Sequence, residues 1–85
     1  MIIDTHCHAG ENSFLPIESL EFEMNQAGVD AAVLIQHGGT YDNNYLFREA
    51  SKRRGRFKVV VMIDPNDADP LGSMEKLWEQ GAAGI

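Results

Sequence analysis

Three glycines recur at nearly equal intervals along this chain, and each lies between a helix-like segment and an apolar run. They are Gly28, Gly55 and Gly81, separated by 27 and 26 residues. The segments before them carry apolar residues at three- and four-residue spacing, as in a helix that buries one face. Glycine is the residue that best adopts the left-handed conformation just past a helix end. The pattern predicts a repeated strand–helix unit.

The expected strands are continuous apolar runs without polar alternation, which is typical of a parallel sheet buried on both faces. They are Ile2–His6, Ala31–Gln36, Phe57–Ile63 and an opening Ala82–Ile85. The expected helices are Ile17–Ala27, roughly Asn43–Arg54 with Asp42 as N-cap, and a third with Asp69 as cap, Pro70 in its first turn and Leu71, Met74, Leu77 and Trp78 facing inward.

This order of elements leaves one face of the sheet bare. Right-handed crossovers between sequential strands place all three helices on the same side. A doubly wound sheet or a closed barrel would cover the other side. Eight steps of about 27 residues approach the ~250 residues typical of a barrel. We therefore expect an α/β fold: about three βα units plus the start of a fourth strand, the N-terminal part of a TIM-type (β/α)8 barrel. Residues 1–85 would form a single incomplete domain, the N-terminal third of such a barrel.

The charge balance excludes several classes of partner. Seven Lys and Arg against thirteen Asp and Glu give a net charge of −6, which disfavours binding to nucleic acid or to an anionic membrane. The basic cluster of residues 52–58 is expected to be a solvated helix end. The longest aliphatic runs have five residues, whereas a spanning helix needs about 20. A single cysteine gives no intramolecular disulfide. We expect a cytoplasmic protein without nucleic-acid or membrane partners.

The main chemical signal lies at the end of the first expected strand, in Asp4-Thr5-His6-Cys7-His8. Strand side chains alternate between faces, so Asp4, His6 and His8 are expected to point the same way. Two imidazoles two residues apart can converge on one metal ion. Asp4 could orient an imidazole as a hydrogen-bond acceptor. These residues predict a metal site at the edge where barrels place their active sites.

Three further residues near strand ends are candidates of weaker kind. His37 begins a loop after the second strand and could contact substrate or serve as an ordinary loop residue. Asp64, before Pro65, could line the same mouth or simply form a turn. Cys7 should face the helices. A role as a small buried side chain is a simpler interpretation of this cysteine than a role as a metal ligand or nucleophile.

A resemblance to a known family adds to this interpretation. The opening Met1–His8 resembles the first strand of the metal-dependent hydrolase (amidohydrolase) superfamily. Further junctions resemble its amidohydrolase-related (amidohydrolase-2) branch: Glu23–Leu34, Asp42–Leu46, Gly55–Phe57, Ile63–Pro65 and Gly81–Ile85. The resemblance implies one divalent metal ion, commonly zinc, with His6 and His8 as two of its ligands. It also implies that the other ligands and the general base, usually an aspartate, lie beyond residue 85.

The resemblance implies that a metal-activated water attacks an amide, ester or lactone carbon of a small-molecule substrate, although some relatives decarboxylate. TatD-type deoxyribonucleases open in a similar way, but they usually carry a second histidine pair where this chain has Met62-Ile63-Asp64-Pro65. A third alternative is a non-catalytic half-barrel module that associates with itself or with a partner. The bare sheet face leads us to expect a homo-oligomer.

Overall fold

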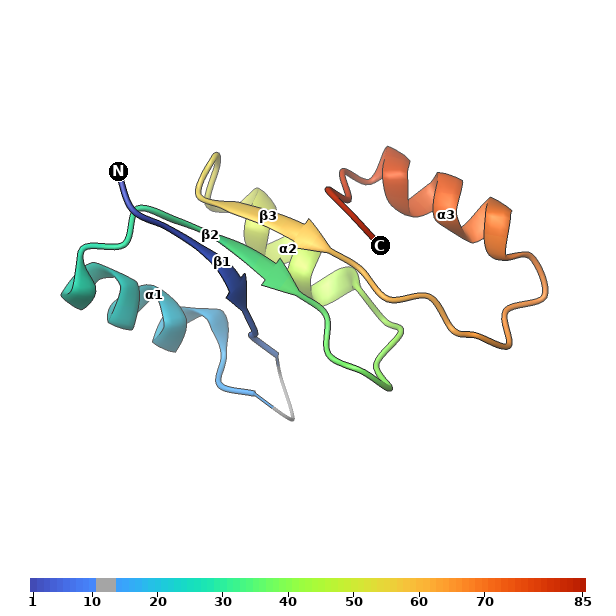
Figure 1. The fold of residues 1–85 in the computed structure, drawn as a ribbon, viewed down its shortest axis with the longest axis horizontal. Coiled ribbons are helices and arrows are strands. Elements are labelled where there is room, and N and C mark those ends of the chain that lie inside the picture. Colours follow the sequence, from blue (N-terminus) through green and yellow to red (C-terminus); the bar gives the residue numbers. More distant parts are fainter. Residues whose placement is uncertain (11–13) are drawn as a thin grey trace.

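The computed structural model describes residues 1–10 and 14–85. Strands and helices alternate along the chain as the glycine spacing predicts (Figure 1). The elements are β1 (Ile3–Cys7), α1 (Ile17–Ala27), β2 (Ala31–Ile35), α2 (Asn44–Ser51), β3 (Phe57–Val60) and α3 (Pro70–Glu79). No helix in this described part combines the length and the apolar character needed to cross a membrane.

The three strands form a parallel sheet in the order β1-β2-β3, which confirms the expected α/β fold with sequential strands. A fourth strand begins beside β3, where Val60 pairs in parallel with Gly84. The backbone N–H of Ala83 donates to Val59 O at 2.8 Å, and that of Val61 donates to Gly84 O at 3.0 Å. The predicted strand Ala82–Ile85 is therefore present as this single bridge, and β3 ends earlier than expected.

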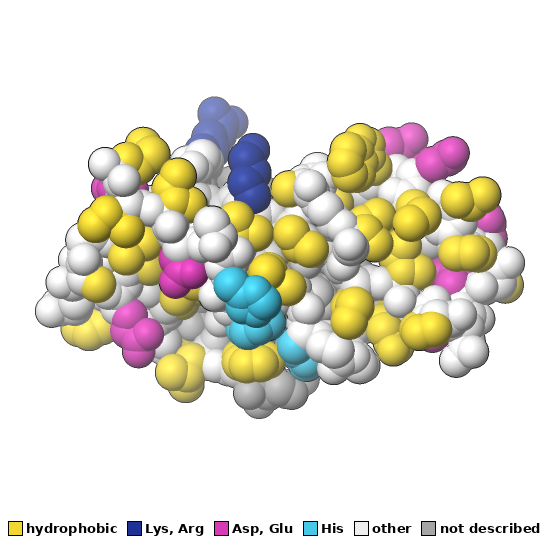
Figure 2. Space-filling view, in the orientation of Figure 1, with side chains coloured by type: hydrophobic (Ala, Val, Ile, Leu, Met, Phe, Trp, Pro, Cys, Tyr) yellow, Lys and Arg dark blue, Asp and Glu magenta, His cyan; other side chains and the backbone are white. Residues whose placement is uncertain are grey.

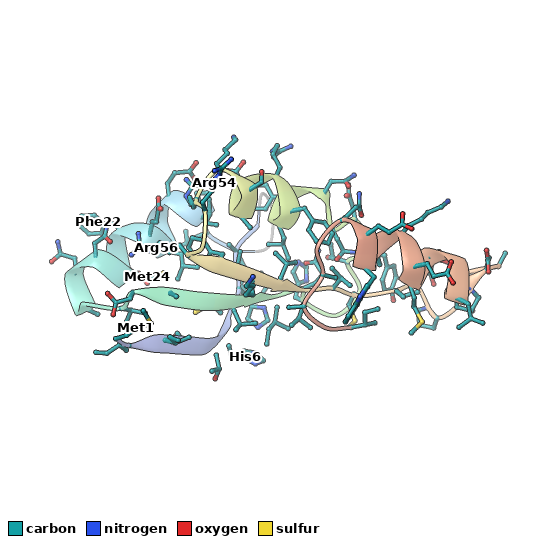
Figure 3. The ribbon with its side chains drawn as sticks, turned by 90° about the horizontal axis from the view of Figure 1, so that it is seen from above. Met1, His6, Phe22, Met24, Arg54 and Arg56 are labelled. Atoms are coloured by element: carbon teal, nitrogen blue, oxygen red, sulfur yellow. The ribbon has the colours of Figure 1, made fainter. Side chains whose placement is uncertain are left out.

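Helices α1 and α2 cover one face of the sheet and leave the other open (Figure 3). The core lies between these two layers. Its largest fully buried side chains are Ile17 from α1, Leu34 from β2 and Leu46 from α2. Leu34 lies in the central strand, which explains why the continuous apolar pattern of that strand predicted burial.

The helix ends follow the predicted backbone chemistry. Gly28 has φ 73° and ends α1, and the backbone N–H of the cap donates to Met24 O. Only a residue without Cβ adopts this conformation at little cost. Asp69 caps α3 by accepting a hydrogen bond from the backbone N–H of Gly72 at 3.1 Å. Helix α2 differs from the prediction, because its N-cap is Asn43 and Asp42 instead accepts from the Asn44 N–H at 3.0 Å.

Helix α3 corrects one expectation. Leu71, Met74 and Trp78 were expected to face inward, but Leu71 is 72% exposed and Trp78 is 63% exposed. Of the four residues named, Leu77 is the one that packs against the core. The apolar stripe is present in the sequence, but one bridge of a fourth strand gives it almost no sheet surface to cover.

The basic segment agrees only in part with the expected solvated helix end: Lys52, Arg54 and Lys58 are exposed, whereas Arg53 and Arg56 are partly buried. The Arg53 side chain is only 16% exposed and pairs with Glu49 at 3.1 Å and with Glu21 at 3.0 Å. Arg56 donates to Asn25 Oδ1 at 2.7 Å and to the carbonyl oxygens of residues 29 and 30. These guanidinium groups tie α1 to α2 and to the loop before β3.

Candidate active site

The candidate site is built on two histidines at the carboxyl end of β1. The Nε2 atoms of His6 and His8 lie 3.2 Å apart, with the rings edge to face. Two nitrogens that bind one tetrahedral zinc ion at 2.0–2.1 Å are separated by about 3.3 Å. His6 projects from the open face of the sheet, away from α1 and α2 (Figure 3). The pair therefore has the spacing of two ligands of one ion.

The neighbouring strand fixes the orientation of His8. Its Nδ1 atom lies 2.7 Å from the carbonyl oxygen of Ile35, the last residue of β2. Because a carbonyl oxygen only accepts, Nδ1 must carry the proton. The lone pair of a neutral His8 is then on Nε2, which faces His6. Metal-binding histidines commonly make such a hydrogen bond with the nitrogen that does not bind the ion.

Asp4 lies close to the histidine pair, but its carboxylate is hydrogen-bonded to a backbone N–H and to a thiol, not to an imidazole. Its Oδ1 atom accepts from the backbone N–H of His6 at 3.0 Å. This bond, helped by the Cys7 thiol, lowers the pKa of the Asp4 carboxyl. The register against β2 shifts between Asp4 and Cys7, so the simple alternation expected for this strand is interrupted. Asp4 thus holds the backbone of His6, and its predicted contact with a ligand imidazole stays a prediction.

Cys7 is directed into the core, as the sequence predicted for this position. Its side chain is buried among residues that include Ile17 and Met24 of α1. Desolvation raises the pKa of the Cys7 thiol to about 11, and the neighbouring Asp4 carboxylate adds to the shift. A thiol in that environment stays protonated at neutral pH, which suits a packing role. The same burial does not extend to Ile3 at the start of β1, which is 52% exposed.

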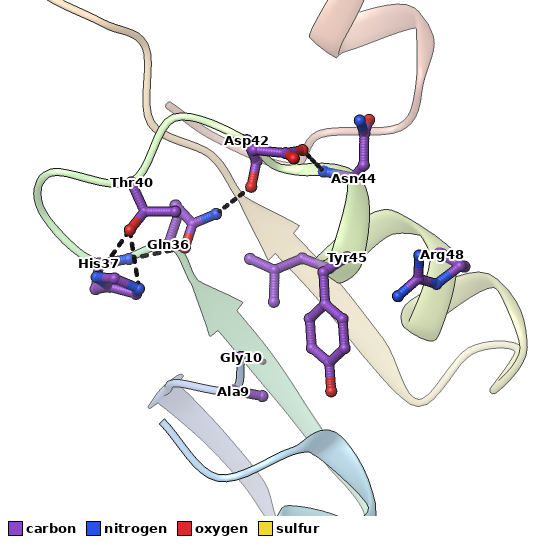
Figure 4. Close-up of a pocket in the computed structure, with 10 residues that line it drawn as sticks. Ala9, Gly10, Gln36, His37, Thr40, Asp42, Asn44, Tyr45 and Arg48 are labelled. Atoms are coloured by element: carbon purple, nitrogen blue, oxygen red, sulfur yellow. Dashed lines mark hydrogen bonds between the residues drawn. The ribbon is translucent and has the colours of Figure 1, made fainter. Parts of the chain in front are cut away.

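His37 lines a cleft of about 390 Å³ between the loops that follow β1 and β2 (Figure 4). Ala9 and Gly10 form one wall, and Thr40 and Tyr45 contribute to the other. Thr40 Oγ1 lies 3.0 Å from His37 Nε2. The volume falls within the range of small-molecule pockets. His37 thus borders a cleft near the histidine pair, as a substrate-contacting residue would.

Two buried amides, Gln36 and Asn43, hold the loop after β2 and were not singled out as site residues from the sequence. Gln36 donates to Asp42 O at 3.0 Å and to Asn43 Oδ1 at 3.3 Å. Asn43 donates to the carbonyl oxygens of Tyr41 and Met62, at 3.2 and 3.0 Å. Its Oδ1 also accepts from the backbone N–H of Met62 at 3.3 Å. The signal available in the sequence was their position, because Gln36 follows an apolar strand and Asn43 precedes a helix.

Asp64 is not brought to the cleft that His37 lines. Its Oδ1 accepts from the backbone N–H of Asn66 at 2.8 Å, and its carbonyl oxygen accepts from Asp67 at 3.0 Å. It borders a different cleft, beside Tyr41 and Ser73. The structure therefore places Asp64 in a turn, which was the simpler of the two interpretations open for it.

The histidine pair fits a divalent cation as part of its ligand set. The two Nε2 atoms have the right separation, and His8 has the tautomer that ligation needs. Within residues 1–10 and 14–85, no group of three or more His, Cys, Asp or Glu side chains is arranged to hold a metal ion. Structural zinc takes four protein ligands and catalytic zinc three. These two residues would thus supply part of a site.

Comparison of this chain with known proteins establishes its fold. No family model matches the chain, and no curated protein matches it. The solved structures that are similar to this chain include the following two. One is a probable 2-pyrone-4,6-dicarboxylic acid hydrolase from Acinetobacter baumannii with citric acid bound, 17% identical with a TM-score of 0.77 over 99% of this chain and 36% of the other. The second is an apo structure from Agrobacterium tumefaciens, 21% identical with a TM-score of 0.70 over 98% of this chain and 35% of the other.

The chain has the fold of one part of a larger barrel-type enzyme. It spans about a third of the length of these two structures. At such identities the likeness establishes the shared fold alone. The agreement confirms the expectation of a partial (β/α) barrel of about three units.

Proposed function

We propose that the complete protein is a metal-dependent hydrolase of the amidohydrolase-related type, with His6 and His8 as two ligands of one divalent cation, commonly zinc in such sites. The observation that carries this proposal is the 3.2 Å separation of the two Nε2 atoms, with His8 Nδ1 bound to Ile35 O. The likeness in fold to a probable hydrolase supports the same conclusion. A bound cation would polarise a carbonyl oxygen and lower the pKa of a water molecule.

The residues of this chain would hold and orient the reacting groups. Asp4 fixes the backbone at His6, and Ile35 O fixes the ring of His8. The cleft beside His37 would accept a small molecule with an amide, ester or lactone group. Gln36 and Asn43 would keep the loop of His37 in place through their buried hydrogen bonds. The general base remains predicted to lie outside these 85 residues.

The test is the metal content and turnover of the complete protein. We expect His6→Ala and His8→Ala each to lower bound metal and to abolish hydrolysis of amide, ester or lactone substrates. His37→Ala is the matched control, since it should change turnover and keep the metal. Normal metal content and turnover in His6→Ala would overturn the proposal. Hydrolysis of single-stranded DNA by the native protein would favour the TatD-type nuclease instead.

The open face of the sheet favours a second candidate, a half-barrel module that associates with itself. Ile2 and Ile3 are exposed at the β1 edge, and Trp78 and Ile85 are exposed around α3. Apolar surface of this kind commonly marks an interface. A sizing column combined with light scattering distinguishes the candidates, because a folded, monomeric protein of 85 residues would contradict self-association.

A further inference from the structure

Phe14 contacts two histidines, His8 after β1 and His37 after β2. Its ring stacks on His8, with centroids 4.8 Å apart and an interplanar angle of 19°. It also meets His37 at 4.9 Å, with a tilt of 58°. Figure 2 shows histidine side chains on the open face of the molecule with hydrophobic atoms directly beside them. The ring thus joins one histidine of the pair, His8, to His37, which lines the cleft.

The loop holds Phe14 in this place through backbone contacts. The N–H of Gly10 donates to Leu15 O at 3.2 Å and draws the two ends of the loop together. A Cβ on residue 10 would lie 4.0 Å from the Cβ and the backbone nitrogen of Phe14, so Gly10 lies close to the start of this side chain. On the far side, the Ile17 N–H donates to the Tyr45 hydroxyl at 2.9 Å. The position of Phe14 is therefore tied to α1 and α2.

The core does not explain the position of this side chain. Phe14 is 38% exposed and does not belong to the buried cluster beneath the sheet. An aromatic ring in a loop normally loses hydrophobic stabilisation when it stays this exposed. Its contacts are instead with two imidazoles, and offset aromatic pairs at this separation are attractive beyond the area that they bury.

The stacked geometry leaves Nε2 of His8, the proposed metal-binding atom, uncovered by Phe14. The lone pair on Nε2 lies in the plane of the imidazole, whereas Phe14 covers the face of the ring. Ile35 O restrains the same ring at Nδ1. One contact sets the direction of the ring, and the other limits its tilt. A ligand held in the binding orientation before the ion arrives loses less freedom on binding, which raises affinity.

We propose that Phe14 is a positioning residue for the metal site, which acts by stacking on His8 and needs an aromatic ring. This inference rests on the proposed function, because it assigns Phe14 a role toward the ion that His6 and His8 would hold. It also adds Phe14 to the residues of the site. The aromatic ring, as distinct from a merely apolar side chain, is the property that matters.

The experiment compares Phe14→Leu with Phe14→Tyr in the complete protein. Leu keeps the apolar character and removes the ring, whereas Tyr keeps the ring. Phe22→Leu is the matched control, because this variant makes the same chemical change at a residue that is exposed on α1. The dissociation constant for Zn²⁺ is measured by competition with a chelator. The proton shifts of the His8 ring are measured by NMR in the metal-free protein.

We expect Phe14→Leu to weaken Zn²⁺ binding by about 3- to 10-fold, with Phe14→Tyr and Phe22→Leu within about twofold of the native protein. The ring-current shift of the His8 protons should vanish in Phe14→Leu and persist in Phe14→Tyr. Native affinity in Phe14→Leu, while His8→Ala loses the metal, would overturn the inference and leave the proposed function intact. A native protein that binds no Zn²⁺ would overturn both.

Discussion

The Nδ1 atom of His8 lies 2.7 Å from the carbonyl oxygen of Ile35, so the last residue of β2 fixes the tautomer of a histidine at the end of β1. Parallel strands bring their carboxyl ends to the same edge of the sheet, which is how a backbone carbonyl 27 residues along the chain reaches this ring. The contact leaves the lone pair on Nε2, which lies at hydrogen-bonding distance, 3.2 Å, from its counterpart on His6. The sheet itself thus prepares the pair for a shared ligand.

This contact predicts a defined proton position on His8. Long-range proton–nitrogen NMR spectra of the metal-free protein at pH 8.5 should show His8 with its proton on Nδ1. Addition of Zn²⁺ should then shift the Nε2 resonance strongly and the Nδ1 resonance little. His37, whose ring nitrogens lie near Thr40 Oγ1, serves as the internal control and should respond weakly. A proton found on Nε2 of His8 would contradict the hydrogen bond to Ile35.

Asn43 is the residue whose amide most restricts the loop after β2. We expect Asn43→Asp to destabilise the protein by about 2–3 kcal/mol, because the variant replaces a donor to two carbonyl oxygens with an acceptor in a buried place. Asn44→Asp is the matched control at the exposed first residue of α2. A negative charge there should be neutral or slightly stabilising, since it faces the positive end of the helix. Urea unfolding measures both, and equal stabilities would contradict the role of Asn43.

Glu49 joins three basic side chains from the same helix and the loop after it. Its carboxylate lies 3.0 Å from Lys52, 3.2 Å from Arg48 and 3.1 Å from Arg53, and its side chain is 7% exposed. We expect Glu49→Gln to cost about 1–2 kcal/mol in urea unfolding. The loss is smaller than for a fully buried pair because Lys52 and Arg48 are more than half exposed. Glu75→Gln, on the exposed side of α3, should stay within about 0.5 kcal/mol.

The same carboxylate predicts a dependence on pH. The hydrogen bond from Lys52, followed by those from Arg48 and Arg53, lowers the pKa of Glu49 below its ordinary value of 4.5. A lowered pKa stabilises the folded state fully above pH 4.5, and this stabilisation is lost as the pH falls below that value. The difference in unfolding free energy between the native protein and Glu49→Gln should therefore shrink between pH 7 and pH 3. A difference that stays constant would show that Glu49 acts through packing and not through charge.

The sequence was sufficient for the parts of the fold that depend on local pattern. The glycine spacing predicted the order of elements, Pro70 with Asp69 marked the start of α3, and the apolar run of β2 predicted the central strand. Of the candidate site, the sequence singled out the pair His6 and His8 and also His37, which lines the cleft. Contacts between segments far apart in the chain were out of reach, because nothing near residue 14 or residue 43 marks a partner on another loop. The prediction that one face of α3 is buried was wrong for the same reason, because burial depends on which segment packs against that face.

Cys7 gives the last prediction, because it lies between two proposed metal ligands and yet faces away from them. Desolvation, followed by the hydrogen bond to Asp4, raises the pKa of its thiol from 9.0 to about 11. At pH 8 the thiolate is then about 100-fold rarer in the folded protein than in the unfolded chain, and only the thiolate reacts with iodoacetamide. We expect alkylation to be slower than in urea by at least that factor. Because the chain has one cysteine, labelling reports this residue alone.

Cys7→Ala should keep the metal that the histidine pair binds, since the thiol is packed against α1 and is not a ligand. Fast alkylation of the folded protein, or loss of Zn²⁺ in Cys7→Ala, would place the sulfur on the open face beside His6 and His8.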